Sequence, residues 1–374
     1  MAMKFVHLMK NEKFANGIVC FYSTFFNNGE HEIIYFLRDK KESCIREQYS
    51  IKQAEFCTQD SKIGVVAYLK SLRCDYIFLH SLFFTSKEKV QLLLDKELLK
   101  KLVWIEWGAD LYSWRQNGQF KAILKNKINY KFRSSFSNIV CIFPPDVDYV
   151  KKQFPCTSRQ IYYAPYNGFP VDEEFLNYKI DSRLAEANKC GEPVWIQIGQ
   201  NSLETLNHIR VLKAISKFKD ENIRIVLPLS YGGTKEYADR VVDYAEKTFP
   251  GKVVALRDFM PKEKYFELIN KVGIAIFDTD RQCALGNIER LFFRNVKVYL
   301  SENGVMYKYF ADLGVPVKKC EDIKSESFKN FIAPPTIENR DGFMKYIKSL
   351  SSIDSTIERW NYIFENLRHV INEK

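Results

Sequence analysis

The chain has 374 residues, 46% of them hydrophobic and 27% charged, a composition that excludes a disordered or fibrous protein. Its nine cysteines are odd in number and widely spaced, without a C-x-x-C pair, so neither a disulfide framework nor a zinc site is indicated. The first residues lack the pattern of a secretory signal, and no apolar run is long enough to span a bilayer. We therefore expect a cytoplasmic protein that touches a membrane only peripherally.

The positive charge lies mostly in the first half of the chain. Residues 1–165 carry 25 Lys and Arg against 16 Asp and Glu, whereas the remaining residues carry 31 against 30. Such an excess attracts polyanions, either nucleic acid or an anionic membrane surface with its phosphate-bearing lipids. The basic residues are interspersed with acidic ones, and no RNA- or DNA-reading motif accompanies them. We therefore expect the first half to contact an anionic membrane surface and no nucleic acid.

The first half alternates short apolar runs with helix-length stretches, which is typical of a doubly wound parallel sheet. Strands are predicted at 4–9, 32–37, 75–80, 102–107, 139–143 and 160–164. Helices are predicted at 12–27, 61–72, 86–99 and 118–136. This pattern defines an N-terminal Rossmann-like domain over residues 1–165.

The alternation stops over residues 166–193, which contain two Gly- and Pro-rich turns and are predicted to be a linker. It then resumes with strands at 194–199, 223–229, 253–256, 272–277, 296–300 and 315–317, and with helices at 204–219, at 234–248 and from about 261. A second Rossmann-like domain is thus predicted over 194–337. A helical tail at 338–374 can pack back on the first domain. Two such α/β domains match the GT-B architecture, whose ligands bind at the carboxyl ends of the strands, in a cleft that both domains face.

Three side chains near predicted strand ends of the first domain are candidates for chemistry. Glu106 lies in the strand predicted at 102–107, and Asp110 follows shortly after it. A carboxylate in such a place can act as a general base toward a hydroxyl, or hold a sugar by hydrogen bonds. Alternatively, Asp110 only caps the next helix. His80 ends another strand, where it either transfers a proton or serves the structure alone.

Polar residues also follow two strands of the second domain. Gly199 and Asn201 stand between a strand and a helix, where main-chain N–H groups and the helix N-terminus can approach a diphosphate. Tyr231 follows the next strand in a Gly-rich segment and can stack on a base. The alternative interpretation of that segment is an ordinary turn.

A third polar segment follows the strand predicted at 272–277. Arg281 and Gln282 precede Gly286 and Asn287, which open a predicted helix. The guanidinium group supplies charge and the helix N-terminus supplies orientation, so the segment can clamp a diphosphate and its sugar. Alternatively, it is a polar loop in which Asn287 caps the helix.

The stretch over residues 118–133 is relevant to the binding partners of the protein. Over residues 118–133, five basic side chains interleave with five apolar ones. A basic amphipathic helix of this kind suits docking on an anionic bilayer. The commoner alternative is a helix whose apolar face lies on the sheet and whose lysines face solvent.

Three segments together resemble a known family. They are Trp107-Gly108-Ala109-Asp110-Leu111-Tyr112, the stretch from Gly199 to Asn207-His208-Ile209, and Arg281-Gln282 followed by Gly286-Asn287-Ile288. The chain is similar to the bacterial TDP-Fuc4NAc:lipid II Fuc4NAc transferases, glycosyltransferase family 56. Further pieces in the same order extend this resemblance over nearly the whole chain; they end at His80, at Tyr231 and near Trp360.

The resemblance implies a GT-B enzyme that takes a 6-deoxy (amino) sugar, such as Fuc4NAc or fucose, from a thymidine diphosphate donor. The acceptor is then an undecaprenyl-diphosphate-linked glycan of a surface polysaccharide, handled at the inner face of the cytoplasmic membrane. Two positions depart from the family pattern: Leu203 stands where an acidic residue follows G-N-S in the best-known members, and Cys283 replaces a second Gln. Both lie in the donor half, so an O-antigen or capsule transferase with a different nucleotide sugar is the variant reading.

We assign Asp110, Glu106 and His80 to the acceptor side. The donor side is assigned to Gly199, Asn201, Tyr231, Arg281, Gln282, Gly286 and Asn287. Asp278-Thr279-Asp280 looks like the D-x-D sequence that binds Mn²⁺ in other transferases, but a helix dipole and Arg281 can neutralise the leaving diphosphate instead. We therefore expect a metal-independent enzyme without a cofactor. The alternatives are a sugar-nucleotide epimerase of the same fold and a basic nucleic-acid-binding module.

Overall fold

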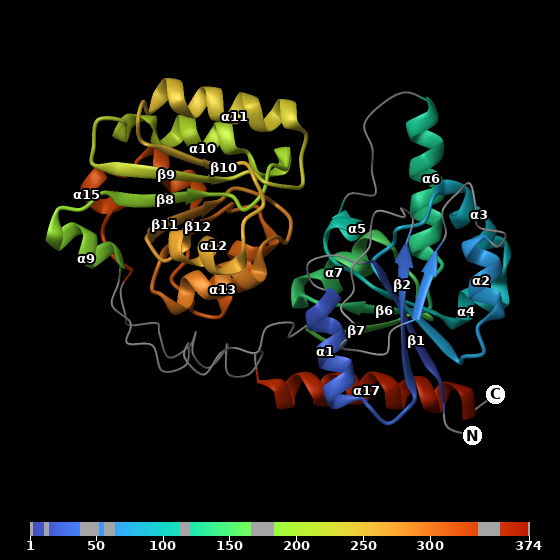
Figure 1. The fold of residues 1–374 in the computed structure, drawn as a ribbon. Coiled ribbons are helices and arrows are strands. Elements are labelled where there is room, and N and C mark those ends of the chain that lie inside the picture. The colour runs from blue at the N-terminus through green and yellow to red at the C-terminus, as the bar shows by residue number, and fades with distance from the viewer. Residues whose placement is uncertain are drawn as a thin grey trace. The chain divides into compact units, whose positions relative to one another are not determined.

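The computed structural model describes residues 3–10, 15–37, 52–55, 64–112, 120–165, 183–335 and 352–372 (Figure 1). The chain forms two compact units. Unit 1 comprises Met1–Val171 together with Ser349–Lys374, and unit 2 comprises Asp172–Lys348. Among the described helices, none combines the length and the apolar character needed to cross a bilayer.

Unit 1 is built on a seven-stranded sheet whose order is β3-β2-β1-β4-β5-β6-β7. All neighbouring strands are parallel. The order reverses beside β1, and ligands of doubly wound sheets bind at such a switch point. The strands are β1 (Phe5–Lys10), β2 (His31–Leu37), β3 (Lys52–Glu55), β4 (Tyr76–His80), β5 (Leu102–Ile105), β6 (Asn138–Cys141) and β7 (Gln160–Tyr163).

Helices cover both faces of this sheet, because each face carries large apolar side chains. One core contains residues of α2, α3, α4, α6 and α7, and the other contains residues of α1 and α17. The helices are α1 (Ala15–Phe25), α2 (Val65–Ser71), α3 (Ser86–Leu94), α4 (Lys96–Lys101), α5 (Ala109–Tyr112), α6 (Phe120–Ser134), α7 (Pro144–Gln153) and α17 (Ile353–Asn372).

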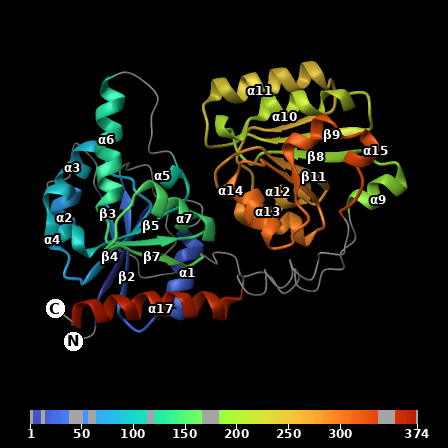
Figure 2. The ribbon, with the colours of Figure 1, turned by 180° about the vertical axis from the view of Figure 1, so that it is seen from behind.

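Helix α17 follows unit 2 in the chain but packs on unit 1 (Figures 1 and 2). Trp360 is fully buried, stacks on Phe364 and meets the ring of Tyr22 edge-on. Its Nε1 donates to the carbonyl oxygen of Pro165 at 3.3 Å. One apolar face of the sheet is therefore covered partly by the C-terminal helix.

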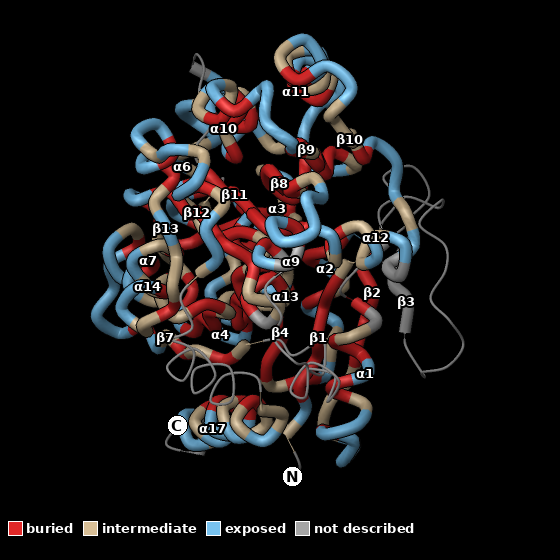
Figure 3. Tube along the Cα trace, turned by 90° about the vertical axis from the view of Figure 1, so that its left-hand side faces the viewer, coloured by how far each residue is buried: buried red, intermediate tan, exposed pale blue. Residues whose placement is uncertain are grey.

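Unit 2 repeats the doubly wound plan with six parallel strands in the order β10-β9-β8-β11-β12-β13. Figure 3 shows that buried residues follow the strands of both sheets, as expected for parallel sheets covered on both faces. The strands are β8 (Val194–Ile198), β9 (Ile223–Pro228), β10 (Val253–Leu256), β11 (Val272–Phe277), β12 (Lys297–Leu300) and β13 (Lys318–Lys319).

Helices α10 and α11 lie on one side of the unit 2 sheet, and α12 and α13 on the other (Figure 1). The elements are α9 (Arg183–Cys190), α10 (His208–Ile215), α11 (Lys235–Thr248), α12 (Lys262–Ile269), α13 (Leu285–Phe293), α14 (Val305–Asp312), α15 (Phe328–Phe331) and the 3₁₀ helices η1 (Glu204–Leu206), η2 (Ser216–Phe218) and η3 (Cys320–Lys324).

Several predicted elements differ in detail from the observed ones. The helix expected at 86–99 is divided at Asp95, whose side chain caps α4 by accepting from Leu98 N at 3.1 Å. The helix expected at 204–219 starts as a 3₁₀ turn, because Asn207 takes a left-handed conformation before α10. The last predicted strand lies at β13 instead of 315–317, and the predicted linker contains α9. Residues 166–182 and 338–351 lie outside the described residues.

Candidate functional site

The side chain of Asp110 is hydrogen-bonded to two loops at the carboxyl end of the unit 1 sheet. Its carboxylate accepts three hydrogen bonds: from Leu82 N at 3.0 Å, from Trp104 Nε1 at 2.7 Å and from Trp107 N at 2.8 Å. Asp110 is the second residue of α5, so it does not occupy the position before the helix that a capping residue takes. The loop after β4 and the turn after β5 are therefore tied to one carboxylate.

Glu106 lies one residue beyond β5 and is fully buried. Its two oxygens accept from Gly108 N at 2.7 Å and from Ile142 N at 3.0 Å. Burial, with the nearby charges of Asp146 and Asp110, raises the pKa of Glu106 well above its usual value. A carboxyl group that holds its proton at higher pH suits proton transfer.

Asp146, in the first turn of α7, is the second member of this buried acid pair. Burial raises the pKa of Asp146 to about 6, while hydrogen bonding to Tyr112 and Glu106 opposes part of the rise. Tyr112 donates its hydroxyl to Asp146. Two neighbouring carboxyl groups titrate as a pair, so Glu106 and Asp146 together can hold or release a proton. Asp146 was not selected from the sequence, although its position after two prolines at a strand end was a usable signal.

His80 belongs to a chain of three histidines. His80 Nε2 lies 3.1 Å from His7 Nδ1, and His7 Nε2 lies 3.0 Å from His31 Nδ1. Burial lowers the pKa of His80 to about 3 and that of His31 to about 4, the latter with help from the charge of Arg368. Burial and the two other imidazoles lower the pKa of His7 as well. Because a neutral imidazole has one donor and one acceptor nitrogen, the tautomer of each ring depends on the next.

The residue after His80 has an unusual backbone. Ser81 adopts a φ of 76°, in the left-handed region that residues other than glycine rarely adopt. Its N–H donates to Ile105 O at 2.9 Å, which joins the ends of β4 and β5. Strained residues of this kind cluster at functional sites. The geometry therefore marks the carboxyl edge of β4 and β5 as the candidate acceptor-side region of unit 1.

In unit 2, Gly199 occupies a position that only glycine fits. Its φ is +66°, and a Cβ atom added there would lie 2.7 Å from His208 Nε2. His208 is fully buried, with Nδ1 3.2 Å from the hydroxyl of Tyr237. Asn201, two residues on, accepts from Leu203 N through its side-chain oxygen at 3.0 Å. The loop after β8 is thus held closely against the start of α10.

The loops after β8 and β9 are joined directly. Ser202 donates both its N–H and its hydroxyl to Tyr231 O, each at 2.8 Å, and its hydroxyl accepts from Gly233 N at 2.9 Å. A Cβ on Gly233 would lie 1.8 Å from Ser202 O, so the two backbones are in close contact. The side chain of Tyr231 remains partly exposed and can contact a ligand.

The third loop at the carboxyl edge of the unit 2 sheet follows β11 and leads into α13. Arg281 and Gln282 are half-buried within it, and α13 begins after Ala284, which has a φ of 52° and provides no side-chain cap. Asn287 is inside the helix, where its N–H donates to Ala284 O at 2.8 Å, so it does not cap α13. The space beside Gly286 is open. The first N–H groups of a helix have no acceptor within it, so the start of α13 favours an anion.

Glu289, also on α13, was not selected from the sequence. It is half-buried, and burial raises its pKa to about 7. It lies one turn after Leu285 on the helix that carries Gly286 and Asn287. A carboxyl group in this position near the helix start can accept hydrogen bonds from ligand hydroxyls.

The two carboxylates of the D-x-D sequence bind protein groups. Asp278 pairs with the guanidinium of Arg210, and Asp280 accepts from Ser301 Oγ at 2.8 Å. Asn207 also donates to the main-chain oxygen of Asp278 at 2.9 Å. Within the described ranges, no group of three or more His, Cys, Asp or Glu side chains is placed to hold a metal ion. The structure thus gives these aspartates structural partners.

Solved structures of glycosyltransferases share this architecture. The HepE protein of Anabaena, crystallised with UDP, superposes with a TM-score of 0.67 at 11% identity, covering 97% of this chain and 100% of that one. An alpha,alpha-trehalose-phosphate synthase (UDP-forming) from Burkholderia vietnamiensis gives 0.64 at 10% identity, covering 100% and 99%. A sucrose-phosphate synthase from Thermosynechococcus elongatus gives 0.67 at 9% identity, covering 98% and 100%. The fold is therefore GT-B, as the alternation of strands and helices predicted.

The sequence also matches a family model. The 4-alpha-L-fucosyltransferases, glycosyl transferase group 56, match over residues 7–330. The chain belongs to this family and is a glycosyltransferase. The match confirms the resemblance carried by the W-G-A-D-L-Y string and the segments of the second domain.

Proposed function

We propose that this glycosyltransferase moves a 6-deoxy (amino) sugar, such as Fuc4NAc or fucose, from a nucleoside diphosphate donor to a lipid-linked saccharide. The donor side of this proposal rests on the arrangement of loops at the carboxyl edge of the unit 2 sheet. There, the loops after β8 and β9 are hydrogen-bonded together, and the loop after β11 leads to the uncapped start of α13. The name of the family and the UDP bound by HepE agree with a nucleotide-sugar donor.

On the donor side, the Arg281 guanidinium and the first turn of α13 hold the diphosphate, and Gln282 and Asn287 orient the sugar. Gly199 and Asn201 let the backbone approach the phosphates, and Tyr231 stacks on the base. As the bond between the anomeric carbon and the diphosphate breaks, the charge on the leaving group is stabilised by Arg281 and the helix N-terminus. This arrangement needs no metal ion, and we propose a metal-independent reaction with thymidine diphosphate as the leaving group.

On the acceptor side, a hydroxyl of the saccharide attacks the anomeric carbon and loses its proton. The Glu106–Asp146 pair is the best-matched base, because the pKa of Asp146 is raised to about 6. The carboxylate of Asp110 accepts hydrogen bonds from three N–H groups, so Asp110 positions the turn. His80 is held neutral at the adjacent strand end and orients the acceptor through its imidazole.

The acceptor that the family resemblance suggests is an undecaprenyl-diphosphate-linked glycan of a surface polysaccharide. The enzyme then works on the cytoplasmic face of the membrane, held there peripherally by its basic first half. The surplus of positive charge in residues 1–165 supports this location.

Calorimetric titration of the full chain with TDP, UDP and GDP, with and without Mg²⁺, tests the donor side. We expect one nucleotide to bind selectively and equally well in both conditions. Arg281→Ala should weaken that binding by roughly 10-fold or more, because hydrogen bonds to charged groups contribute about 1.5–3 kcal/mol. The matched control is Arg224→Ala, at the amino end of β9, which should bind like the parent. Equal binding by Arg281→Ala and the parent would refute the clamp.

A donor-consumption assay distinguishes a transferase from an epimerase. With nucleotide sugar alone, we expect only slow hydrolysis, and fast release of nucleoside diphosphate once a lipid-linked saccharide is added. Conversion of the donor to an epimer without acceptor would contradict the proposal.

A further inference from the structure

The buried side chains of helix α6, among its described residues, lie in its second half. Asn129, Phe132 and Arg133, in its second half, are buried against unit 1. Arg133 Nη1 donates to Asn129 O at 3.0 Å, and Lys89 of α3 donates to Asn129 Oδ1 at 2.7 Å. The first turns, in contrast, extend past α3 and the neighbouring strand ends (Figures 1 and 2). The start of the helix therefore projects from unit 1.

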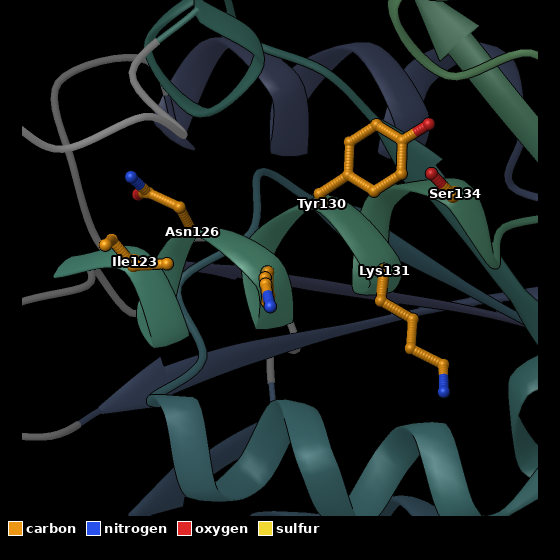
Figure 4. Close-up of a pocket in the computed structure, with 6 residues that line it drawn as sticks. Ile123, Asn126, Tyr130, Lys131 and Ser134 are labelled. Atoms are coloured by element: carbon orange, nitrogen blue, oxygen red, sulfur yellow. The ribbon is translucent and has the colours of Figure 1, made fainter. Parts of the chain in front are cut away.

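Helix α6 exposes large apolar side chains. Ile123 and Leu124 are 53% and 56% exposed, and Tyr130 is 40% exposed. Ile123 and Tyr130 also line an open groove along α6 with Asn126, Lys127, Lys131 and Ser134 (Figure 4). A helix whose apolar face simply lay on the sheet would bury Ile123 and Leu124. These residues are instead available to a partner that offers an apolar phase.

The charge on the same helix has one sign. Lys121, Lys125, Lys127 and Lys131 are all exposed, and α6 contains no acidic residue. A cationic helix with exposed apolar residues between its lysines fits a surface that is anionic outside and apolar below. A nucleic acid is anionic but has no apolar phase that Ile123 and Leu124 could enter. An acidic protein surface has no apolar layer deep or wide enough for these side chains.

We propose that the first turns of α6 are the membrane-docking surface of this enzyme, formed by Lys121, Ile123, Leu124, Lys125 and Lys127. The lysines bind anionic lipid headgroups, and Ile123 and Leu124 insert between the acyl chains. Arg133, at the other end of the helix, donates two hydrogen bonds to the main-chain oxygen of Asp110. Docking therefore presents the carboxyl edge of β5 at a fixed distance from the membrane. The inference deepens the proposed function, since it rests on an acceptor carried by a lipid.

Sedimentation of the full chain with lipid vesicles tests the surface. The vesicles contain either phosphatidylcholine alone or equal amounts of phosphatidylcholine and phosphatidylglycerol. We expect binding only to the anionic vesicles, falling as salt rises. Lys121→Gln with Lys125→Gln should weaken binding by roughly 25-fold, since each lysine near such a surface contributes about a factor of five. Ile123→Gln with Leu124→Gln should weaken it comparably through lost insertion.

Two controls match these variants in exposure. Lys235→Gln with Lys247→Gln makes the same charge change on exposed positions of α11 in unit 2. Tyr362→Gln removes an apolar side chain, 61% exposed, from α17. Both controls should bind vesicles like the parent. All exchanged positions are exposed, so folding should be retained in every variant.

The proposal is overturned if the parent binds both vesicle types alike, or if the α6 variants bind like the parent. It is also overturned if only the lysine variant loses binding while double-stranded DNA competes fully, because α6 would then be a general polyanion site. The vesicle assay contains neither donor nor acceptor, whereas the nucleotide titration contains no lipid. Failure of one therefore leaves the other informative.

Discussion

Arg133 donates two hydrogen bonds to the main-chain oxygen of Asp110, from Nε at 3.0 Å and from Nη2 at 2.7 Å. The carboxylate of Asp110 accepts three more from other residues. The carboxylate and the main-chain oxygen of Asp110 thus both hold the turn that follows β5. This turn also carries Gly108, whose N–H reaches Glu106. The position of the acid pair therefore depends on α6.

Arg133→Met should destabilise unit 1 by about 2–4 kcal/mol, because it keeps an unbranched apolar stem but leaves a buried carbonyl without its donors. Differential scanning calorimetry measures the change as a shift of the unit 1 transition. Lys131→Met, an exposed neighbour on α6, is the control and should change stability by no more than about 0.5 kcal/mol. Equal shifts for the two variants would show that the Arg133 hydrogen bonds contribute little.

Gly199→Ala should cost more stability than Gly251→Ala. The two glycines have similar φ values, +66° and +71°, so the backbone strain of alanine is similar, roughly 1 kcal/mol. Only at Gly199 does the new Cβ meet His208, at 2.7 Å, whereas the space around Gly251 is empty. The difference in urea-unfolding free energy isolates the contact. Gly199→Ala should also weaken nucleotide binding, and unchanged binding would remove Gly199 from the donor side.

Chelation should leave the activity unchanged. Addition of EDTA, followed by Mn²⁺ or Mg²⁺, tests this in the transfer assay. Asp280→Asn should retain most activity, because an amide oxygen can still accept from Ser301. Asp278→Asn should instead lower stability by about 1–3 kcal/mol, because it weakens the pair with Arg210. Loss of activity with EDTA, restored by Mn²⁺, would return the D-x-D sequence to the role of a metal site.

The stability of unit 1 should fall as the pH drops from about 6.5 toward 4. His31 and His80 have pKa values of about 4 and about 3 in the folded state, below the usual 6.5. The unfolded chain therefore takes up more protons in this range, which favours unfolding. His31→Gln removes one of these groups and should flatten the fall, as measured by urea unfolding at several pH values.

Asp146 acts in the opposite direction. Its pKa of about 6 in the folded state means that the folded chain holds a proton between pH 4 and 6 that the unfolded chain releases. This contribution stabilises the fold as the pH drops. Asp146→Asn removes it and should make the acid-side fall steeper. If His31→Gln and Asp146→Asn changed the slope in the same direction, one of the two burial arguments would be wrong.

The doubly wound plan could be predicted because most strands are continuous apolar runs. Strand β11, for example, reads Val-Gly-Ile-Ala-Ile-Phe and is buried throughout. Strand β3, in contrast, reads Lys-Gln-Ala-Glu and carries no hydrophobic signal, since it lies at the sheet edge. Helix α7 was missed because it opens with two prolines, which resemble a turn although the first helical turn accepts them.

Residues of the candidate site could be predicted only where a reactive or charged side chain lies at the end of a predicted strand. His80, Glu106 and Arg281 were selected in this way. His7 and His31 were not, because their contact with His80 depends on strand register: His7 lies opposite Phe78, and Phe5 lies opposite His31. Asp146 was missed for a similar reason, since its meeting with Glu106 follows from the pairing of β5 and β6. Local sequence does not contain these distances.

The position of α17 has a consequence for biosynthesis. The ribosome makes the strands of unit 1 first, and the helix that buries Tyr22 and Phe5 only after all of unit 2. Until then, one apolar face of the nascent sheet stays partly uncovered, and the fold of unit 1 is completed only after unit 2 has been made. Unit 2 is contiguous and has no such delay. During synthesis, the half assigned to the donor can therefore mature before the half assigned to the acceptor.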